Sequence, residues 1–440
     1  MKYDLKKMNI AVIGLGYVGM PLAVALAKYG TVYGYDVNKT RVSELKDGWD
    51  SNREIRQNVL RTTSCKFTDE LSDIKEADIY IVTVPTPIDE ENEPDLSIVE
   101  KATATIGSLI NKGDIIIYES TVYPGVTEDI CGPILETASG LKSGEGFILG
   151  YSPERINPGD EVHTVENITK VVAAQTDDVA NLLVELYGQM NGNNIFKAKD
   201  IKTAEASKAI ENAQRDINIA FMNEVTMLLN KMGMSSHDVI EAARTKWNFL
   251  PFTPGLVGGH CIGVDPYYLA KSALMVGHEP EVILAGRKTN DSMGAYVAGR
   301  IDRFLNQAKD CDYKTERKKA NILLLGFTFK ENINDIRNTK VIDIVKELES
   351  FGYDIDIHDP HAMPEEAEKE YGITVMTALP QDKKYDCVTL AVNHRIYTEM
   401  SAKNITGLLN SGHGFKPVIY DIKGIWKTLD FTDDVSYETL

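Results

Sequence analysis

Cysteine is scarce in this chain, and its placement excludes two common roles. The 440 residues contain five cysteines, at positions 65, 131, 261, 311 and 387, and none belongs to a C-x-x-C pair. An odd, widely spaced set argues against a disulfide framework and against a zinc site, so we predict no metal centre. Thiols without disulfides are typical of a reducing compartment, and the sequence therefore predicts a cytoplasmic protein.

Basic runs and low-complexity tracts are also absent. The chain has 47 lysines and arginines against 65 aspartates and glutamates, a formal net charge of −18. This excess disfavours nucleic acid as a partner, but it permits a local cationic pocket for an anionic ligand. With 43% hydrophobic and 25% charged residues the composition is that of a globular protein, and the length predicts two or three domains.

The N-terminal stretch MKYDLKKMNIAVIGLGYVGMPLAVALA has two interpretations. Lysines, an apolar run and an Ala-x-Ala-like end are typical of a secretory signal. The same residues also fit the first strand, turn and helix of a nucleotide-binding fold, which explains the glycines as well. We therefore predict neither export nor a membrane partner.

Three glycines follow the apolar run NIAVI at the spacing G-x-G-x-x-G. This spacing permits a tight turn, a close approach of the backbone to a pyrophosphate, and close packing of a helix on a strand. A second strand, TVYGYDV, ends at Asp36, where an acid accepts from the ribose hydroxyls of NAD and repels the 2′-phosphate of NADP. The predicted NAD contacts in this unit are Gly14, Gly16, Tyr17, Val18, Gly19, Asp36 and Arg41.

Strands and helices continue to alternate after this unit. The segments ADIYIVTVPTP, DIIIYESTVYPG and GFILGYSPERI each read as a buried strand that runs into a polar turn. Ligands of doubly wound sheets bind at the carboxyl ends of the strands. The residues that we therefore expect near the cofactor are Pro85, Thr86, Glu119, Ser120, Thr121, Glu154 and Arg155.

From residue 201 the pattern predicts a long helix that ends near Gly233. Its polar residues Glu205, Lys208, Asn212 and Arg215 are spaced three or four apart and share one face. Two interpretations of this face stay open. It is either a solvated face with salt bridges or a covered face that meets an active site or a second subunit.

A second nucleotide-like unit begins near residue 318 and repeats the plan of strand, turn, helix, strand and acid. The glycine fingerprint is missing, which argues against a second dinucleotide. The turn after Gly326 instead carries Phe327, Phe329, Lys330 and, further along, Arg337. Aromatic and cationic side chains suit the base and phosphates of a different nucleotide. The predicted fold is thus α/β, with two Rossmann-like doubly wound parallel-sheet domains joined by a long helical spine.

Seven motifs together resemble the UDP-glucose/GDP-mannose dehydrogenase family from end to end. In chain order they are GLGYVGMPLA, VPTP, ESTVYPG, SPERINPG, AEASKAIEN, GLVGGHCIGVDPYYL and GFTFKENINDIRNT. The form of SPERINPG and GGHCIGVDPYYL is most similar to the UDP-N-acetylglucosamine/galactosamine 6-dehydrogenases of capsule and O-antigen synthesis. The resemblance implies an NAD-binding domain (1–200), a central helical domain for dimerisation and catalysis (201–312) and a UDP-sugar-binding domain (313–440).

The resemblance also implies a reaction. It is the NAD-dependent, four-electron oxidation of the 6-hydroxyl of UDP-N-acetylglucosamine, or of UDP-N-acetylgalactosamine, to the uronic acid. UDP-N-acetylmannosamine and UDP-glucose are alternative substrates. Cys261 would hold the aldehyde as a thiohemiacetal and then as a thioester that water cleaves. Two other functions predict different yields of NADH per sugar, namely one for a two-electron reductase and none for a nucleotide sensor.

Further site residues are implied by the same resemblance. Lys208 and Asn212 would stabilise an oxyanion, Thr121 would hold the water, and Glu154 and Asp265 are acid/base candidates, with the proton assigned at each step left open. Arg337 would bridge NAD and the active site, Arg155 would read the acetamido group, and Arg244 would reach the substrate from the partner of a homodimer or larger assembly. The predicted substrate contacts are Glu154, Arg155, Lys208, Asn212, Arg215, Arg244, Phe249, Leu250, Gly255, Gly258, Phe329 and Lys330.

Overall fold

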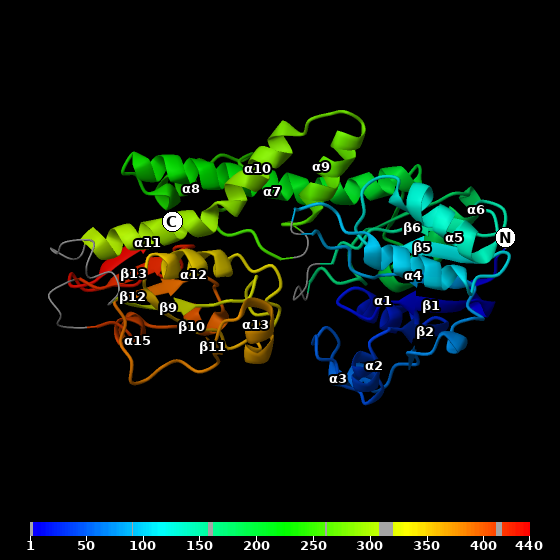
Figure 1. Cartoon of the computed structure of the whole chain (residues 1–440), viewed down its shortest axis with the longest axis horizontal. Helices are drawn as coiled ribbons and strands as arrows, with labels where there is room; N and C mark the ends of the chain where they lie inside the picture. Colours follow the sequence, from blue (N-terminus) through cyan, green and yellow to red (C-terminus); the bar gives the residue numbers. More distant parts are fainter. Residues whose placement is uncertain (1–2, 90, 157–161, 260–261, 308–319, 411–415) are drawn as a thin grey trace. The chain divides into compact units, whose positions relative to one another are not determined.

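The computed structural model describes residues 3–89, 91–156, 162–259, 262–307, 320–410 and 416–440 (Figure 1). The chain separates into two compact units. The first comprises Met1–Asn212 with Tyr267–Glu279, and the second comprises Ala213–Pro266 with Pro280–Leu440. Helix α7 (Ile201–Lys231) contributes residues to both units. The predicted domain limits at residues 200 and 312 stay a prediction.

In the described part of the first unit, one sheet of eight strands contains the predicted nucleotide fold. Its order is β3 (Lys66–Thr68), β2 (Thr31–Tyr35), β1 (Asn9–Ile13), β4 (Ile79–Val82), β5 (Ile115–Tyr118), β6 (Ile148–Tyr151), β7 (Lys170–Ala174) and β8 (Ile195–Lys197). The neighbouring strands are parallel except for the antiparallel pair β6 and β7. The order reverses between β1 and β4, and the carboxyl ends of strands at such a switch point are where ligands bind.

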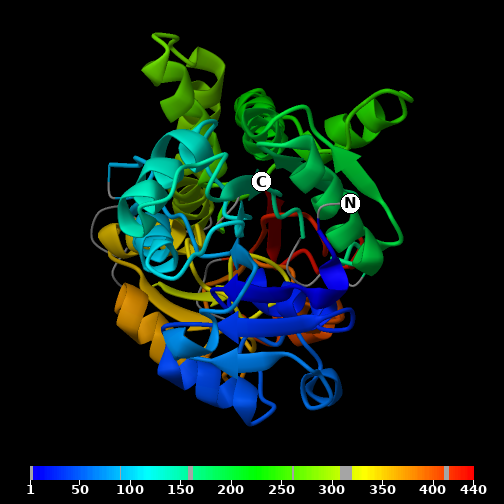
Figure 2. The ribbon, with the colours of Figure 1, turned by 90° about the vertical axis from the view of Figure 1, so that its right-hand side faces the viewer.

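Helices cover both faces of this sheet. The connections that build outward from β1 in opposite directions place their helices on opposite faces because parallel crossovers are right-handed. Accordingly α4 packs on α5 on one face (Figure 1). Helix α6 connects β7 to β8 and packs on α1 on the other face, because β7 runs antiparallel to β6 and its crossover is therefore inverted. Figure 2 shows the blue strands β1 and β2 side by side. The helical segments are α1 (Gly19–Leu26), α2 (Lys39–Lys46), α3 (Gln57–Leu60), α4 (Ser97–Gly107), α5 (Gly132–Ser139), α6 (Asp177–Asn191), α9 (Asp265–Met275), η1 (Leu5–Lys7), η2 (Leu71–Asp73) and η3 (Val126–Cys131).

The second unit holds a fully parallel sheet of six strands in its described residues. Its order is β11 (Val375–Met376), β10 (Asp354–His358), β9 (Asn321–Leu325), β12 (Cys387–Leu390), β13 (Val418–Asp421) and β14 (Ser436–Thr439). Alternate side chains of β9 enter two different cores. Ile322 and Leu324 belong to one cluster, and Leu323 and Leu325 belong to the other. Both faces of the strand are therefore buried, which explains its uniformly apolar sequence.

The helices of the second unit pack around this sheet and beside one another. Helix α11 lies against α12, and both contribute to one core with β9 (Figure 1). The bounds are α8 (Ser236–Arg244), α10 (Glu281–Asp291), α11 (Met293–Gln307), α12 (Val341–Ser350), α13 (Pro364–Tyr371), α14 (Arg395–Thr398) and α15 (Ala402–Thr406).

The predicted fold class is confirmed. Two doubly wound sheets and a long connecting helix are present, and the antiparallel pairing of β7 with β6 is a feature that the sequence did not predict. None of the described helices combines the length and the hydropathy that a membrane span requires.

Candidate active site

The three glycines of the G-x-G-x-x-G motif differ in why each position suits a glycine. Gly14 adopts φ +95°, a left-handed conformation that favours glycine. A Cβ atom on Gly19 would lie 1.9 Å from the Gly14 carbonyl oxygen and 2.3 Å from Thr83 Oγ1, so only glycine lets α1 approach the sheet. Gly16 has open space where its Cβ would stand and is exposed. The turn, with half-buried Tyr17 and Val18, therefore fits a pyrophosphate at the start of α1.

The acid at the end of β2 is built into the same turn. Asp36 Oδ2 accepts from the Leu15 N–H at 2.7 Å, and Oδ1 accepts from the Asn38 N–H at 2.8 Å. The half-buried carboxylate lines a pocket of about 290 Å³ and keeps lone pairs for the hydroxyls of a ribose. The pocket is lined by Leu15, Gly16, Asp36, Asn38, Thr40, Arg41, Glu44, Ser51 and Asn52.

Arg41 forms a wall of this pocket. Its Nε donates to the Leu15 carbonyl at 3.0 Å, and its Nη2 lies 2.7 Å from the carboxylate of Asp50. Both groups are buried. Because the guanidinium is already paired, it does not offer a vacant cation to a 2′-phosphate, which fits the predicted preference for NAD.

Asp36→Asn is expected to weaken NAD binding by about 1–3 kcal/mol, or roughly tenfold to a hundredfold, because the amide replaces one acceptor of the ribose hydroxyls. Titration of NAD and NADP into the variant and the wild type measures this loss. Asp47→Asn, at the exposed end of α2, is the control. Unchanged NAD affinity in Asp36→Asn, or equal use of NADP by the wild type, would remove the assignment.

The ends of β4 and β5 are tied together by two hydroxyl groups. Thr86 Oγ1 donates to the Thr121 carbonyl at 2.6 Å, and Ser120 Oγ donates to the Val84 carbonyl at 2.5 Å. Thr86 and Thr121 are half-buried, and Pro85 is exposed. The structure thus brings these predicted residues to one edge of the sheet.

A buried lysine joins two glutamates at the next strand ends. Lys170, the first residue of β7, lies 2.6 Å from Glu119 Oε2 and 3.1 Å from Glu154 Oε2, and it is 1% exposed. The Tyr187 hydroxyl donates to the other oxygen of Glu119. Burial raises the pKa of Glu119 in spite of the attraction of Lys170. Burial alone would lower the pKa of Lys170, but the two carboxylates outweigh it and raise that pKa.

Glu154 is held at both of its oxygens. Oε1 accepts from the N–H groups of Arg155 and Ile156 at 2.7 and 2.6 Å, and Oε2 accepts from Lys170. Sequence reasoning proposed Glu154 and placed Glu119 near the cofactor, but it did not single out Lys170. The available signal was a lone lysine at the start of the apolar strand KVVAA.

Arg155 has partners other than a ligand. Its Nε and Nη2 pair with the two oxygens of Glu211 at 3.1 and 2.9 Å, and Nη1 donates to the Thr169 carbonyl at 2.8 Å. If Arg155 also binds the acetamido group of the substrate, it has to do so while it keeps this bidentate ion pair with Glu211. The pair ties the end of β6 to helix α7 between Lys208 and Asn212, which lie three residues before and one residue after Glu211.

The polar face of α7 is covered over its first turns. Glu205, Lys208 and Asn212 are 0%, 7% and 5% exposed, whereas Arg215 is exposed. Glu205 accepts from the N–H groups of Gly125 and Thr127 at 2.6 and 2.9 Å, and burial raises the pKa of its carboxyl to about 7. Glu205 is thus a structural anchor for η3. Three of the four residues are thus covered within the chain itself, and Arg215 is exposed in the single chain.

Lys208 differs from the other buried ions of the first unit. Within the part of the chain that the structure describes, its ammonium makes no hydrogen bond or ion pair. The side chain is buried, but the ammonium keeps some accessible surface, so it can receive an anionic ligand or intermediate.

The second unit repeats the turn of the first with one decisive change. Gly326 adopts φ +93°, and its N–H donates to the carbonyl that ends β10, as the Gly14 N–H donates to the end of β2. Asp359 accepts from the N–H groups of Phe327 and Thr328 at 2.6 and 2.9 Å. It therefore occupies the structural position of Asp36.

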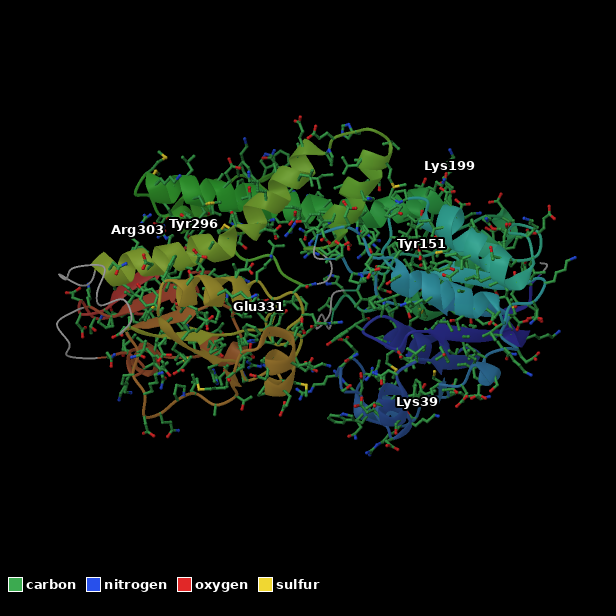
Figure 3. The ribbon with its side chains drawn as sticks, in the orientation of Figure 1. Lys39, Tyr151, Lys199, Tyr296, Arg303 and Glu331 are labelled. Atoms are coloured by element: carbon green, nitrogen blue, oxygen red, sulfur yellow. The ribbon has the colours of Figure 1, made fainter. Side chains whose placement is uncertain are left out.

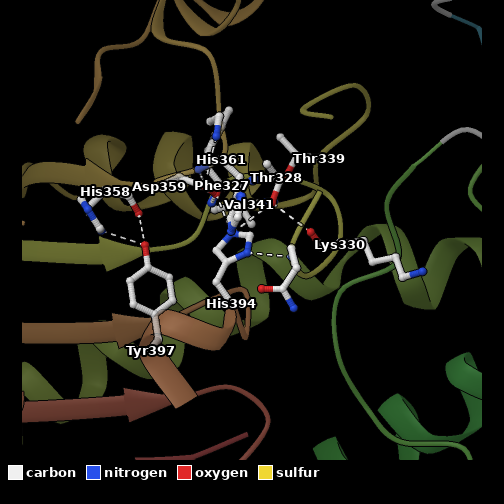
Figure 4. A network of polar contacts seen from close by, with 12 residues as sticks. Phe327, Thr328, Lys330, Thr339, Val341, His358, Asp359, His361, His394 and Tyr397 are labelled. Atoms are coloured by element: carbon white, nitrogen blue, oxygen red, sulfur yellow. Dashed lines mark hydrogen bonds and ion pairs between the residues drawn. The ribbon is translucent and has the colours of Figure 1, made fainter. Parts of the chain in front are cut away.

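Asp359, however, is fully buried, and Figure 4 shows it within a network of polar contacts. Its Oδ2 lies 2.9 Å from His394 Nε2, and its Oδ1 accepts from the N–H groups of His361 and Ala362. Burial alone would raise the pKa of Asp359, but these hydrogen bonds lower it well below its ordinary range. This acid stabilises the turn and is not presented to a ribose, which explains why the repeated plan does not give a second NAD site.

Phe329 and Lys330 are both half-buried. The residues that follow them in the same turn are held by ion pairs. Glu331, labelled in Figure 3, pairs with Lys423 after β13 at 2.6 Å, and the attraction of this lysine outweighs burial and lowers the pKa of Glu331. Arg337 forms a forked pair with Asp335 at 2.9 and 2.6 Å.

The glycines before Cys261 pack on this turn. The Gly259 N–H donates to the Asn338 carbonyl at 3.1 Å, and a Cβ atom on Gly258 would lie 2.6 Å from the same oxygen. Their small size therefore serves the contact with Asn338. Cys261 itself lies outside the described residues, and Asp265, the first residue of α9, is buried.

The loop that carries the predicted substrate contacts Phe249, Leu250 and Gly255 is bonded to α7. The Asn223 amide donates to the Gly255 carbonyl at 3.0 Å and accepts from the Gly255 N–H at 2.8 Å. Phe249 is half-buried, whereas Leu250 and Arg244 are exposed.

Comparison with known proteins decides the family. Three family models match in chain order: the NAD binding domain of the UDP-glucose/GDP-mannose dehydrogenase family at 8–191, its central domain at 202–292 and its UDP binding domain at 323–428. A UDP-N-acetyl-D-glucosamine 6-dehydrogenase of Pseudomonas aeruginosa is 49% identical over 95% of this chain and 97% of its own length. The chain belongs to the UDP-glucose/GDP-mannose dehydrogenase family. It is an NAD-dependent UDP-sugar dehydrogenase, and the predicted family, enzyme class and cofactor are confirmed.

Other relatives agree with this membership. A UDP-N-acetyl-D-glucosamine 6-dehydrogenase of Salmonella typhi is 47% identical over 96% of this chain and 97% of its own length, and Protein CapL of Staphylococcus aureus is 47% identical over 95% and 96%. Among solved structures, a UDP-D-ManNAc dehydrogenase from Pyrococcus horikoshii superposes with a TM-score of 0.86 at 29% identity, covering 98% of this chain and 99% of that one.

Proposed function

We propose that this dehydrogenase oxidises the 6-hydroxyl of UDP-N-acetylglucosamine to the carboxylate, with the galacto epimer as a second substrate. The two bacterial relatives with that name are 49% and 47% identical over nearly the whole chain, which favours glucosamine over the mannosamine epimer of the 29% identical structure. The relation to CapL supports a role in surface-polysaccharide synthesis.

The reaction needs a nucleophile, a cation and water. One alcohol, two NAD⁺ and one water give one carboxylate, two NADH and three protons. The Gly14–Gly19 turn would hold NAD, and two successive NAD⁺ molecules would supply the oxidising power, one hydride each. Between the two oxidations the Cys261 thiolate would add to the aldehyde, and water would later release the acid from the thioester.

Lys208 carries the proposal on the structural side. Each addition to the carbonyl carbon places negative charge on its oxygen, and the ammonium of this buried side chain, which has no partner among the described residues, is suited to that charge. Asn212, buried one turn further along α7, would add an amide donor. Glu154, Asp265 and Thr121 are proposed for the protons and the water, Lys330 and Phe329 for the UDP group, and Arg337 for bridging NAD and the active site.

The substrate is tested by comparing kcat/KM for UDP-glucose and the UDP-N-acetyl derivatives of glucosamine, galactosamine and mannosamine. A site that bonds the acetamido group leaves a buried polar partner unpaired when UDP-glucose binds, at a cost of about 1–3 kcal/mol. We therefore expect UDP-glucose to be poorer by roughly tenfold to a hundredfold. A higher value for UDP-glucose would reject the sugar assignment and leave the dehydrogenase class intact.

We also propose a homodimer built on α7. Phe221 and Leu228 are 61% and 56% exposed and, seven residues apart, lie on one face of the helix, and Met232, which follows its last residue, is 62% exposed. A second copy of this chain would cover them and bring Arg244 to the partner's substrate.

Light scattering is expected to give a dimer for the wild type and a monomer for Leu228→Asp, which should also have a raised KM for the UDP-sugar. A wild type that is monomeric at assay concentration would contradict this.

A further inference from the structure

The strongest unexplained feature of the first unit is the buried group of Glu119, Lys170 and Glu154. Its three charged side chains come from the ends of β5 and β6 and from the start of β7, and each is at most 8% exposed. Two carboxylates share one ammonium at 2.6 and 3.1 Å. A buried ion pair is expensive to assemble and is weak evidence for a contribution to stability alone.

The two carboxylates are not equivalent. Glu154 accepts from two backbone N–H groups and from Lys170, whereas Glu119 accepts from Lys170 and from the Tyr187 hydroxyl. Donors favour the ionised form of a carboxyl group, and the Glu154 carboxylate accepts from more of them than the Glu119 carboxylate does. Burial raises the pKa of Glu119.

We propose that Lys170 is a positioning residue of the dehydrogenase, whose ammonium fixes the direction and the negative charge of the Glu154 carboxylate. Glu119 pairs with the Lys170 ammonium at 2.6 Å, and the Tyr187 ring, whose hydroxyl bonds Glu119, has its centre 5.1 Å from the same ammonium. This inference rests on the proposed acid/base role of Glu154. It adds a residue that touches neither the sugar nor the nicotinamide and acts through the carboxylate.

The test is the pH profile of kcat at saturating NAD and UDP-N-acetylglucosamine. Lys170→Met removes the only cation in hydrogen-bond contact with Glu154 among the described residues, so the acid limb should move to higher pH by about one unit or more. The maximal rate should fall by about tenfold to a hundredfold.

Lys170→Arg should restore most of the rate. Glu119→Gln removes the competing charge and should leave the limb in place or move it to lower pH.

Two comparisons separate positioning from folding. Lys170→Met combined with Glu119→Gln leaves no buried charge unpaired on the Glu119 side, so it should fold and still show the raised acid limb. In a Glu154→Gln background Lys170→Met should cause little further loss of rate, because the two changes act through one group. Lys197→Met, at the exposed end of β8, is the control with an unchanged profile.

Several results would overturn the inference. One is a wild-type pH profile in Lys170→Met with NAD affinity and melting temperature preserved. Another is a uniform loss of rate in Lys170→Met and Glu119→Gln without any movement of the limb. If the wild type oxidises a different UDP-sugar, the proposed substrate fails, and the same variants are measured on that sugar.

Discussion

Cys261→Ser is expected to bind NAD and the UDP-sugar as the wild type does and to lose acid production by at least about a thousandfold. Serine can add to the aldehyde, but it is a much weaker nucleophile than a thiolate, and its ester is a poorer intermediate for hydrolysis. The measurement is NADH formation together with the uronic acid released, from single turnover to steady state.

The other thiols provide the control. Cys65, Cys131 and Cys387 are buried, and burial raises the pKa values of their thiols to about 12, 11 and 12. They are therefore protonated at neutral pH and unsuited to nucleophilic attack. Cys65→Ser should keep its activity. Near-normal acid production by Cys261→Ser would reject the covalent step.

Lys208→Met is expected to lower kcat by about a hundredfold to a thousandfold, the usual effect of removing one preorganised donor to an oxyanion. Methionine keeps the volume and the burial of the side chain and removes the charge. Because the ammonium has no described protein partner, the substitution leaves no opposite charge stranded, and stability should be preserved or increased.

Steady-state kinetics with NAD titration measures this prediction. Lys202→Met is the matched control, since it changes an exposed lysine two turns earlier on α7 that pairs with Asp129. Equal losses in the two variants, or a Lys208→Met enzyme that loses only NAD affinity, would contradict a role at the reacting carbon.

The sequence predicted those parts of the site that are formed by residues close to one another along the chain. The G-x-G-x-x-G turn and Asp36 lie within one strand–helix–strand unit, so spacing alone predicted that they stand together, whereas their contact with NAD stays a prediction. The second turn after Gly326 was found in the same way. Its acid could not be interpreted fully, because His394, which is 35 positions away in the sequence, decides that Asp359 faces inward.

Contacts across the sheet were beyond such reasoning. Lys170 meets Glu119 only because β7 reverses direction beside β6, which no local pattern signals. Arg155 looked available because its partner Glu211 lies 56 residues away on α7. Arg215 shares the helical spacing of Lys208 but is exposed, because the cover of that face ends before it.

The central claim is a four-electron oxidation of a UDP-N-acetylhexosamine at one active site. It is tested most directly by incubating limiting UDP-N-acetylglucosamine with excess NAD and counting NADH at completion, with the product identified by mass spectrometry. The proposed function predicts about two NADH per sugar and the UDP-linked uronic acid as the product, without free aldehyde. One NADH with an aldehyde product, or no NADH with any UDP-N-acetylhexosamine, would contradict it.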